Sequence, residues 1–174
     1  LTYDSTSGAY KATVTAPGQT SFNQSGGYYN VKVEATNPAG TTGTAEGGTL
    51  SGLRLVVKEK IAPTITVLSP SSGAFVTNNK QPVVFNIVDE AGGSGINLSS
   101  LVVKQDGTAV ASDTIKTTAI TNGYSVTYTP AAALSDGSHT VTIDVSDNDG
   151  NAAVQKSTTY KVDTVPPVLN VTAP

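Results

Sequence analysis

Strict alternation of apolar and polar residues is the dominant pattern along the chain. In 139–145, Val141, Ile143 and Val145 alternate with threonine and aspartate, and 29–35 shows the same alternation. Successive side chains of a strand point to opposite faces, so each segment has one apolar and one polar face. This pattern predicts half-buried antiparallel strands.

The residues from 61 to 164 contain a series of such segments. Two dipeptides, Asp106-Gly107 and Asn122-Gly123, are typical hairpin turns in which both residues take positive φ. Phe85 and Ile87 are the expected core residues of the second segment. No stretch keeps a period of 3.6 residues over ten positions, so we expect an all-β fold. The predicted strands are 64–68, 83–88, 101–104, 114–120, 124–128, 139–146 and 154–162.

The chain also repeats itself. Residues 27–40 match 137–150 without a gap, and 61–70 match 165–174, with Pro63 and Pro167 in equivalent positions. Their separation is 104 residues (167 minus 63), close to the roughly 100 residues of an immunoglobulin-like sandwich. We therefore expect tandem antiparallel β-sandwiches cut from a longer array. The predicted domains are 1–60, the C-terminal half of one module; 61–164, a complete module; and 165–174, a linker and the first strand of a further module.

Composition excludes several classes of protein. The 174 residues include no Cys and one His, so disulfide scaffolds, zinc ribbons and most histidine-based sites are excluded. A net charge of −3 argues against nucleic-acid binding. No apolar run approaches the roughly 20 residues of a membrane span, so we expect no membrane insertion.

Particular motifs resemble a known family. The pattern Tyr-x-Val-x-Val-x-Ala-x-Asn-x-x-Gly, from Tyr29 to Gly40, resembles the sixth strand and following turn of immunoglobulin-like and fibronectin type III domains. The segments 88–96, 136–139 and 147–151 resemble bacterial immunoglobulin-like repeats of secreted surface proteins and prophage tail proteins. The resemblance implies a two-sheet sandwich with Tyr29 at the tyrosine corner. It also implies an extracellular location, on a cell surface or a virion.

The single histidine lies beside residues that suggest a catalytic triad. His139 follows Ser138 and lies close to Asp136. Neighbours on one strand point to opposite faces, so Ser138 and His139 cannot easily meet. His139 aligns with Tyr29, and we expect its ring to close the end of the core. We therefore expect no catalytic residues and no enzyme activity.

The turn around Gly150 resembles part of a calcium loop. In the EF-hand pattern, positions 1 and 12 would fall on Val145 and Lys156, which are not oxygen ligands. Asp89 and Glu90 are another acidic pair that can join a site at one end of the sandwich. We expect no bound metal and no cofactor. The residues to examine for calcium are Asp147, Asp149 and Asn151.

These observations favour a non-enzymatic structural or adhesive module, a spacer or display rod in a bacterial surface or phage-tail protein. Its expected partners are neighbouring modules, joined by stiff proline-containing linkers. One alternative is an accessory module that binds surface glycans or cell wall, for which only Tyr28 is expected to be an exposed aromatic ring. Two others are an accessory domain of a secreted enzyme and strand exchange between chains.

Overall fold

The computed structural model describes residues 2–171, which form two compact units that divide between Glu59 and Lys60. The structure is all-β, with three short 3-10 turns at Ser25–Gly27, Ser51–Leu53 and Ser112–Thr114. No helix among residues 2–171 is long and apolar enough to cross a membrane.

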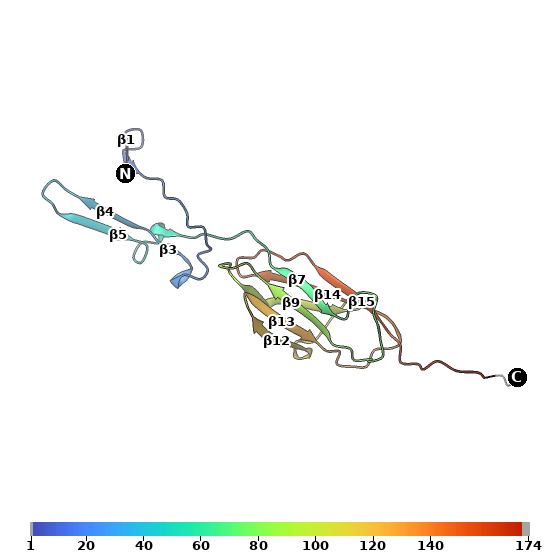
Figure 1. The fold of residues 1–174 in the computed structure, drawn as a ribbon. Coiled ribbons are helices and arrows are strands. Elements are labelled where there is room, and N and C mark those ends of the chain that lie inside the picture. The colour runs from blue at the N-terminus through green and yellow to red at the C-terminus, as the bar shows by residue number, and fades with distance from the viewer. Residues whose placement is uncertain (1, 172–174) are drawn as a thin grey trace. The chain divides into compact units, whose positions relative to one another are not determined.

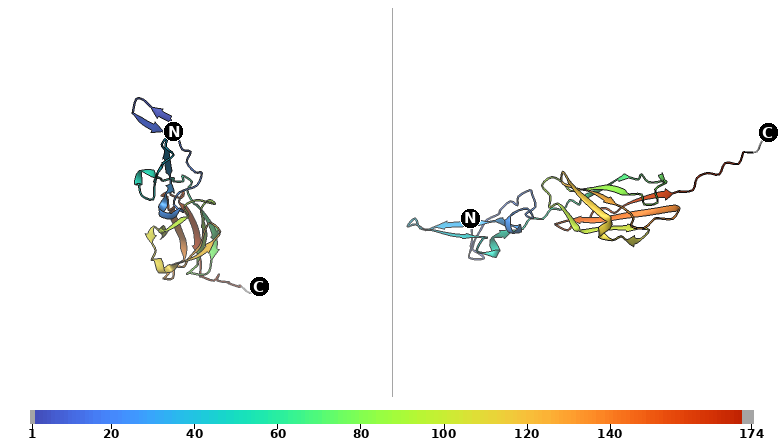
Figure 2. Two further views of the ribbon diagram at one scale, coloured as in Figure 1. Left: turned by 90° about the vertical axis from the view of Figure 1, so that its left-hand side faces the viewer. Right: turned by 90° about the horizontal axis from the view of Figure 1, so that it is seen from below.

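The second unit is a two-layer sandwich (Figure 1 and Figure 2). One sheet has five strands in the order β11-β10-β14-β15-β8, and the other has four in the order β12-β13-β9-β7. All pairings are antiparallel except that of β8 with β15. The strands are β7 Thr64–Ser69, β8 Phe75–Val76, β9 Val83–Val88, β10 Ile96–Gln105, β11 Thr108–Ala109, β12 Ile115–Ile120, β13 Gly123–Tyr128, β14 Gly137–Asp147 and β15 Lys156–Val162.

The alternating residues fill the space between the two sheets. Phe85 and Ile87 of β9 are fully buried, as the sequence predicts, and so are Val141 and Ile143 of β14. β10 begins five residues before the predicted 101–104 segment, and β15 begins two residues after the predicted 154. The inward rows confirm a sandwich whose core is built from aliphatic and aromatic side chains.

Of the two predicted hairpin turns, the first is correct and the second is shifted. Asp106 and Gly107 have φ of 50° and 82° and form a two-residue turn between β10 and β11. In the second hairpin, Ile120 pairs with Gly123, so the turn residues are Thr121 and Asn122. Gly123 belongs to β13 and does not have positive φ. The absence of a side chain at this position has a different physical reason, because the carbonyl of Ile87 lies directly beside Gly123.

The first unit contains three separate two-stranded pairs. β1 pairs with β2, β3 with β6, and β4 with β5. The buried Ser21 ties this unit together, because its Oγ donates to the carbonyl of Gly27 at 2.9 Å and its backbone N–H donates to the carbonyl of Val57 at 2.8 Å. The strands are β1 Thr2–Asp4, β2 Ala9–Lys11, β3 Tyr29–Asn30, β4 Lys32–Thr36, β5 Thr42–Glu46 and β6 Arg54–Leu55.

The alternation in 29–35 gives only partial burial. Tyr29, Val31 and Val33 are half-buried, and Ala35, expected to face a core, is exposed. Within residues 2–59 no second sheet covers the apolar face of these strands. A strand face is buried only where a second layer packs on it, and that layer is present in the second unit alone.

Candidate functional site

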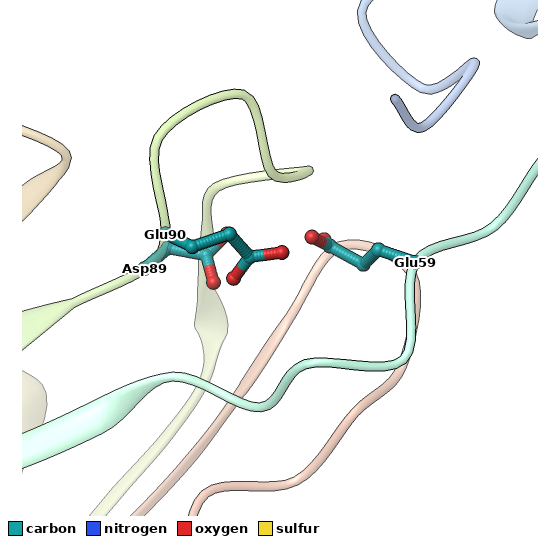
Figure 3. Close-up of side chains that lie close together, drawn as sticks. All are labelled: Glu59, Asp89 and Glu90. Atoms are coloured by element: carbon teal, nitrogen blue, oxygen red, sulfur yellow. The ribbon is translucent and has the colours of Figure 1, made fainter. Parts of the chain in front are cut away.

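The loop after β9 carries two carboxylates, Asp89 and Glu90 (Figure 3). Asp89 is 5% exposed, and its Oδ2 accepts a hydrogen bond from the backbone N–H of Gly95 at 2.7 Å. Its own N–H donates to the carbonyl of Asn122 at 2.9 Å. Asp89 therefore folds the 89–95 loop back on itself. Glu59, also labelled in Figure 3, belongs to the first unit.

The three residues to examine for calcium lie in one turn at the end of β14. Oδ1 of the buried Asp147 accepts hydrogen bonds from the N–H groups of Gly150 and Asn151, at 2.6 and 2.8 Å. Its Oδ2 accepts from Nδ2 of Asn151 at 2.7 Å. Asp149 is half-buried in the same turn. Both carboxylate oxygens of Asp147 thus hold the turn together, which is how aspartate commonly acts in turns. The expectation that no metal binds at Asp147, Asp149 and Asn151 stays a prediction.

Side chains and backbone groups tie this turn to the 89–95 loop. Nδ2 of Asn148 donates to the carbonyls of Ser94 and Gly95 at 2.8 and 3.0 Å, and the N–H of Asp149 donates to Oγ of Ser94 at 3.0 Å. We call residues 89–95 and 147–151 the acidic pole. Its polar groups chiefly hold two loops of the sandwich against each other.

The other end of β14 carries the single histidine. Nδ1 of His139 lies 2.7 Å from Oδ2 of Asp106, and Nε2 lies 2.8 Å from the carbonyl oxygen of Ser135. The other oxygen of Asp106 accepts from the N–H of Thr140 at 2.7 Å. His139 is 8% exposed, so its ring closes this end of the core, as predicted from its alignment with Tyr29. We call Asp106, Ser135 and His139 the histidine pole.

Tyr29 plays the equivalent part in the first unit. Its hydroxyl donates to the carbonyl of Gln19 at 3.3 Å, ten residues upstream. Tyr29 pairs with Leu55 of the antiparallel strand β6, as His139 pairs with Tyr160 of β15. At the aligned positions 29 and 139, a polar-tipped ring therefore bonds backbone that lies upstream in the sequence.

The groups of the histidine pole have shifted pKa values. Burial lowers the pKa of His139, but the hydrogen bonds with Asp106 and with the Ser135 carbonyl, and the negative charge of Asp106, outweigh burial and raise the pKa above its ordinary value. Burial raises the pKa of Asp106, but its bonds with His139 and Thr140 outweigh this and lower it. Burial, with the nearby Tyr128 and Asp106, raises the pKa of Tyr160 to about 12.

The residues that suggest a catalytic triad are not brought together. The carboxylate of Asp136 accepts hydrogen bonds from the N–H and Oγ1 of Thr164, at 3.1 and 2.8 Å, and the imidazole of His139 bonds Asp106 and Ser135. Asp106 was not anticipated as the partner of His139, because 33 residues separate them. The one feature of the sequence that could have drawn attention to Asp106 is the Asp106-Gly107 turn.

The exposed aromatic rings differ from the sequence expectation. Tyr28 is half-buried beneath the guanidinium of Arg54, 4.6 Å from the ring centroid. Tyr3 and Tyr10 of the β1–β2 hairpin are exposed instead, with ring centroids 5.3 Å apart. Phe75 of β8 is 71% exposed, with Nζ of Lys161 5.4 Å from its ring. The prediction that Tyr28 is the exposed ring is wrong, because an arginine from β6 covers it.

Comparison with solved structures finds chains with a related arrangement at low sequence identity. CopC from Methylosinus trichosporium OB3b is 19% identical, with a TM-score of 0.42, and the match covers 60% of this chain and 99% of CopC. The fibronectin(III)-like modules of Clostridium thermocellum CbhA are 18% identical, with a TM-score of 0.37, covering 75% of this chain and 60% of theirs. A mutant of the SrpA adhesin from Streptococcus sanguinis is 19% identical, with a TM-score of 0.39, covering 60% of both chains.

Comparison with curated protein sequences gives no match. The model of the bacterial Ig-like domain matches residues 69–164, which is more than half of the chain. The matched residues run from the end of β7 through all the later strands of the sandwich. The chain therefore belongs to the bacterial Ig-like domain family.

Proposed function

We propose that the chain is a non-enzymatic structural segment, a spacer or display rod made of Ig-like modules in an extracellular bacterial surface or phage-tail protein. The observation that carries the proposal is the pairing of two strands that lie near opposite ends of the second unit in the sequence. β8, near the start of the module, pairs in parallel with β15, its last strand. The expected partners of the chain are neighbouring modules.

Parallel pairing of these strands suits a module that bears tension. The N–H groups of Lys161 and Asp163 donate to the carbonyls of Ala74 and Val76, at 2.8 and 3.0 Å. Tension between the ends of the second unit first loads β7, which precedes β8 and pairs with β9. Once β7 has detached, the tension pulls β8 and β15 past each other along their length. Several hydrogen bonds are then loaded at once, whereas bonds at a hairpin end would break one after another.

A backbone substitution tests the load-bearing function. We expect Asp163→Pro in the full chain to lower the force at which the second unit unfolds, because proline has no N–H to donate to Val76. Single-molecule force spectroscopy measures this force, with a contour-length gain of roughly 300 Å identifying the unit from its number of residues.

Asp163→Ala is the matched control. It removes the same side chain but keeps the backbone donor, so its unfolding force should stay close to that of the wild type. Equal unfolding forces for the proline variant and the wild type would contradict a load-bearing pair of β8 and β15.

The second candidate function is binding of glycans or cell wall by an accessory module. The exposed pair of Tyr3 and Tyr10 favours it, since aromatic rings offer apolar faces with polar tips for such contacts. Binding of the full chain on a glycan array or in a cell-wall pull-down, lost in Tyr10→Ser, would support this function. A flat array and an empty pull-down would count against it.

A further inference from the structure

The single histidine faces two groups that can only accept hydrogen bonds. The carboxylate of Asp106 lies 2.7 Å from Nδ1, and the backbone carbonyl of Ser135 lies 2.8 Å from Nε2. A neutral imidazole carries one N–H, while the imidazolium carries two. Only the protonated ring can donate to both partners at once.

Within residues 2–171, the ionisable side chains that interact with His139 keep their charge between about pH 6 and pH 9. Asp106, in the turn after β10, has a lowered pKa and stays ionised. Tyr160 of β15, whose ring centroid lies 6.3 Å from that of His139, and Tyr128 of β13 both have raised pKa values and stay neutral. A change at this pole over that range therefore begins with His139.

The two partners of His139 belong to different segments. Asp106 lies in the β10–β11 turn, which is also held by its own N–H donating to the carbonyl of Thr140 at 2.8 Å and by Thr140 N–H donating to its Oδ1. Ser135 lies in the 129–136 loop between β13 and β14. The loop has anchors of its own: the N–H of Leu134 donates to the carbonyl of Asn79 at 2.8 Å, and Nζ of Lys80 donates to the carbonyl of Ala131 at 2.7 Å. The protonated ring adds a bond to the Ser135 carbonyl at the end of the loop that leads into β14.

We propose that His139 is a proton-operated latch that holds the Ser135 end of the 129–136 loop when its ring is protonated and releases the Ser135 carbonyl when the ring is neutral. The proton that remains on the neutral ring stays on Nδ1, because the carboxylate of Asp106 is the stronger acceptor. The lone pair on Nε2 then faces the lone pairs of the Ser135 carbonyl. This inference concerns the module itself and does not depend on the spacer function.

The direction of the pH dependence follows from the raised pKa. A group whose pKa is higher in the folded state contributes stability that is fully present below its unfolded pKa, about 6.5 for histidine. That stability is lost as pH rises through the folded pKa. The latch is therefore closed in mildly acidic solution and open in alkaline solution.

Nitrogen-detected NMR of the imidazole in the full chain tests the proposal. The chain has one histidine, so its ring signals are unambiguous. We expect the ring to titrate above pH 6.5, with both nitrogens protonated below that pKa and Nδ1 alone protonated above it. Amide signals of residues 131–136 should shift with the same midpoint, while that of Gly107 should change little. A ring that titrates at or below 6.5, or a neutral ring protonated on Nε2, would overturn the latch.

Asp106→Asn removes the negative charge beside His139 and keeps the turn that carries it. Asparagine suits the φ of 50° at this position, so the turn should form. Burial is then opposed only by the hydrogen bond with the Ser135 carbonyl, so the pKa of His139 should fall from its wild-type value. The matched control is Asp144→Asn, because Asp144 lies on the same strand β14 as His139 and its carboxylate bonds the side chain of Gln155 instead. This variant should leave the titration of His139 unchanged. An unchanged His139 titration in Asp106→Asn would contradict the proposal.

Chemical denaturation of the full chain at several pH values gives a second readout. Between pH 6 and pH 9 the folding equilibrium constant of the second unit should fall by about tenfold for each pH unit by which the folded pKa of His139 exceeds the unfolded one. In Asp106→Asn this fall should become smaller. A wild-type equilibrium constant that rises over this range would overturn the latch.

Discussion

Replacing Phe85 with alanine is expected to lower the free energy of unfolding of the second unit by about 3–5 kcal/mol. Phe85 lies at the middle of β9 and is fully buried between the two sheets. Its removal takes a large apolar surface out of the core and leaves a cavity that rigid sheets fill poorly. Because small domains are stable by only about 5–15 kcal/mol, this loss should leave the unit close to unfolding.

The chain provides a matched control in Phe75→Ala. Phe75 is 71% exposed, so the same truncation at this position should change the free energy of unfolding by only about 0.5 kcal/mol. Urea denaturation followed by NMR signals of β9 and β14 measures both variants in the full chain. Similar losses for the two phenylalanines would mean that the predicted inward row of β9 is not the core of the module.

The contrast between the two phenylalanines shows how much of the fold the sequence predicts. Phe85 lies within a regular alternation, and its burial was predicted from that pattern alone. Phe75 stands in a two-residue strand, too short for any alternation. Its place on the edge of the five-stranded sheet depends on pairing with Lys161, 86 residues away (161 minus 75), which no local pattern reveals.

Less of the candidate site than of the fold could be predicted, because its contacts also join residues that are far apart in the sequence. His139 was expected to close the core because it aligns with Tyr29 in the repeat. Its partner Asp106 comes from another strand pair, and Ser135 contributes only a backbone carbonyl, which carries no signature in the sequence. Sequence patterns predict which face a residue occupies, whereas hydrogen bonds across the end of a sandwich depend on how its loops meet.

The position of the turn at Thr121 and Asn122 places Gly123 within β13, where a substitution should cost much stability. A Cβ atom on Gly123 would lie 2.0 Å from the carbonyl oxygen of Ile87, on the neighbouring strand β9. Real Cβ atoms do not approach an oxygen atom so closely, so β13 must move away from β9. These two strands form the centre of the four-stranded sheet. We expect Gly123→Ala to lower the free energy of unfolding of the second unit by about 3 kcal/mol or more.

Gly107→Ala distinguishes this steric cause from the cost of a left-handed turn. Gly107 has a φ of 82° and open space where a Cβ would point, so alanine there should cost only the roughly 1–2 kcal/mol of the left-handed conformation. If Asn122-Gly123 formed a turn with positive φ at both residues, the two glycines would be equivalent and their substitutions would cost the same. A markedly larger loss for Gly123→Ala, measured by urea denaturation of the full chain, supports the register in which Ile120 pairs with Gly123. Equal losses would support the turn predicted from the sequence, because a clash with the Ile87 carbonyl arises only when Gly123 lies within the strand.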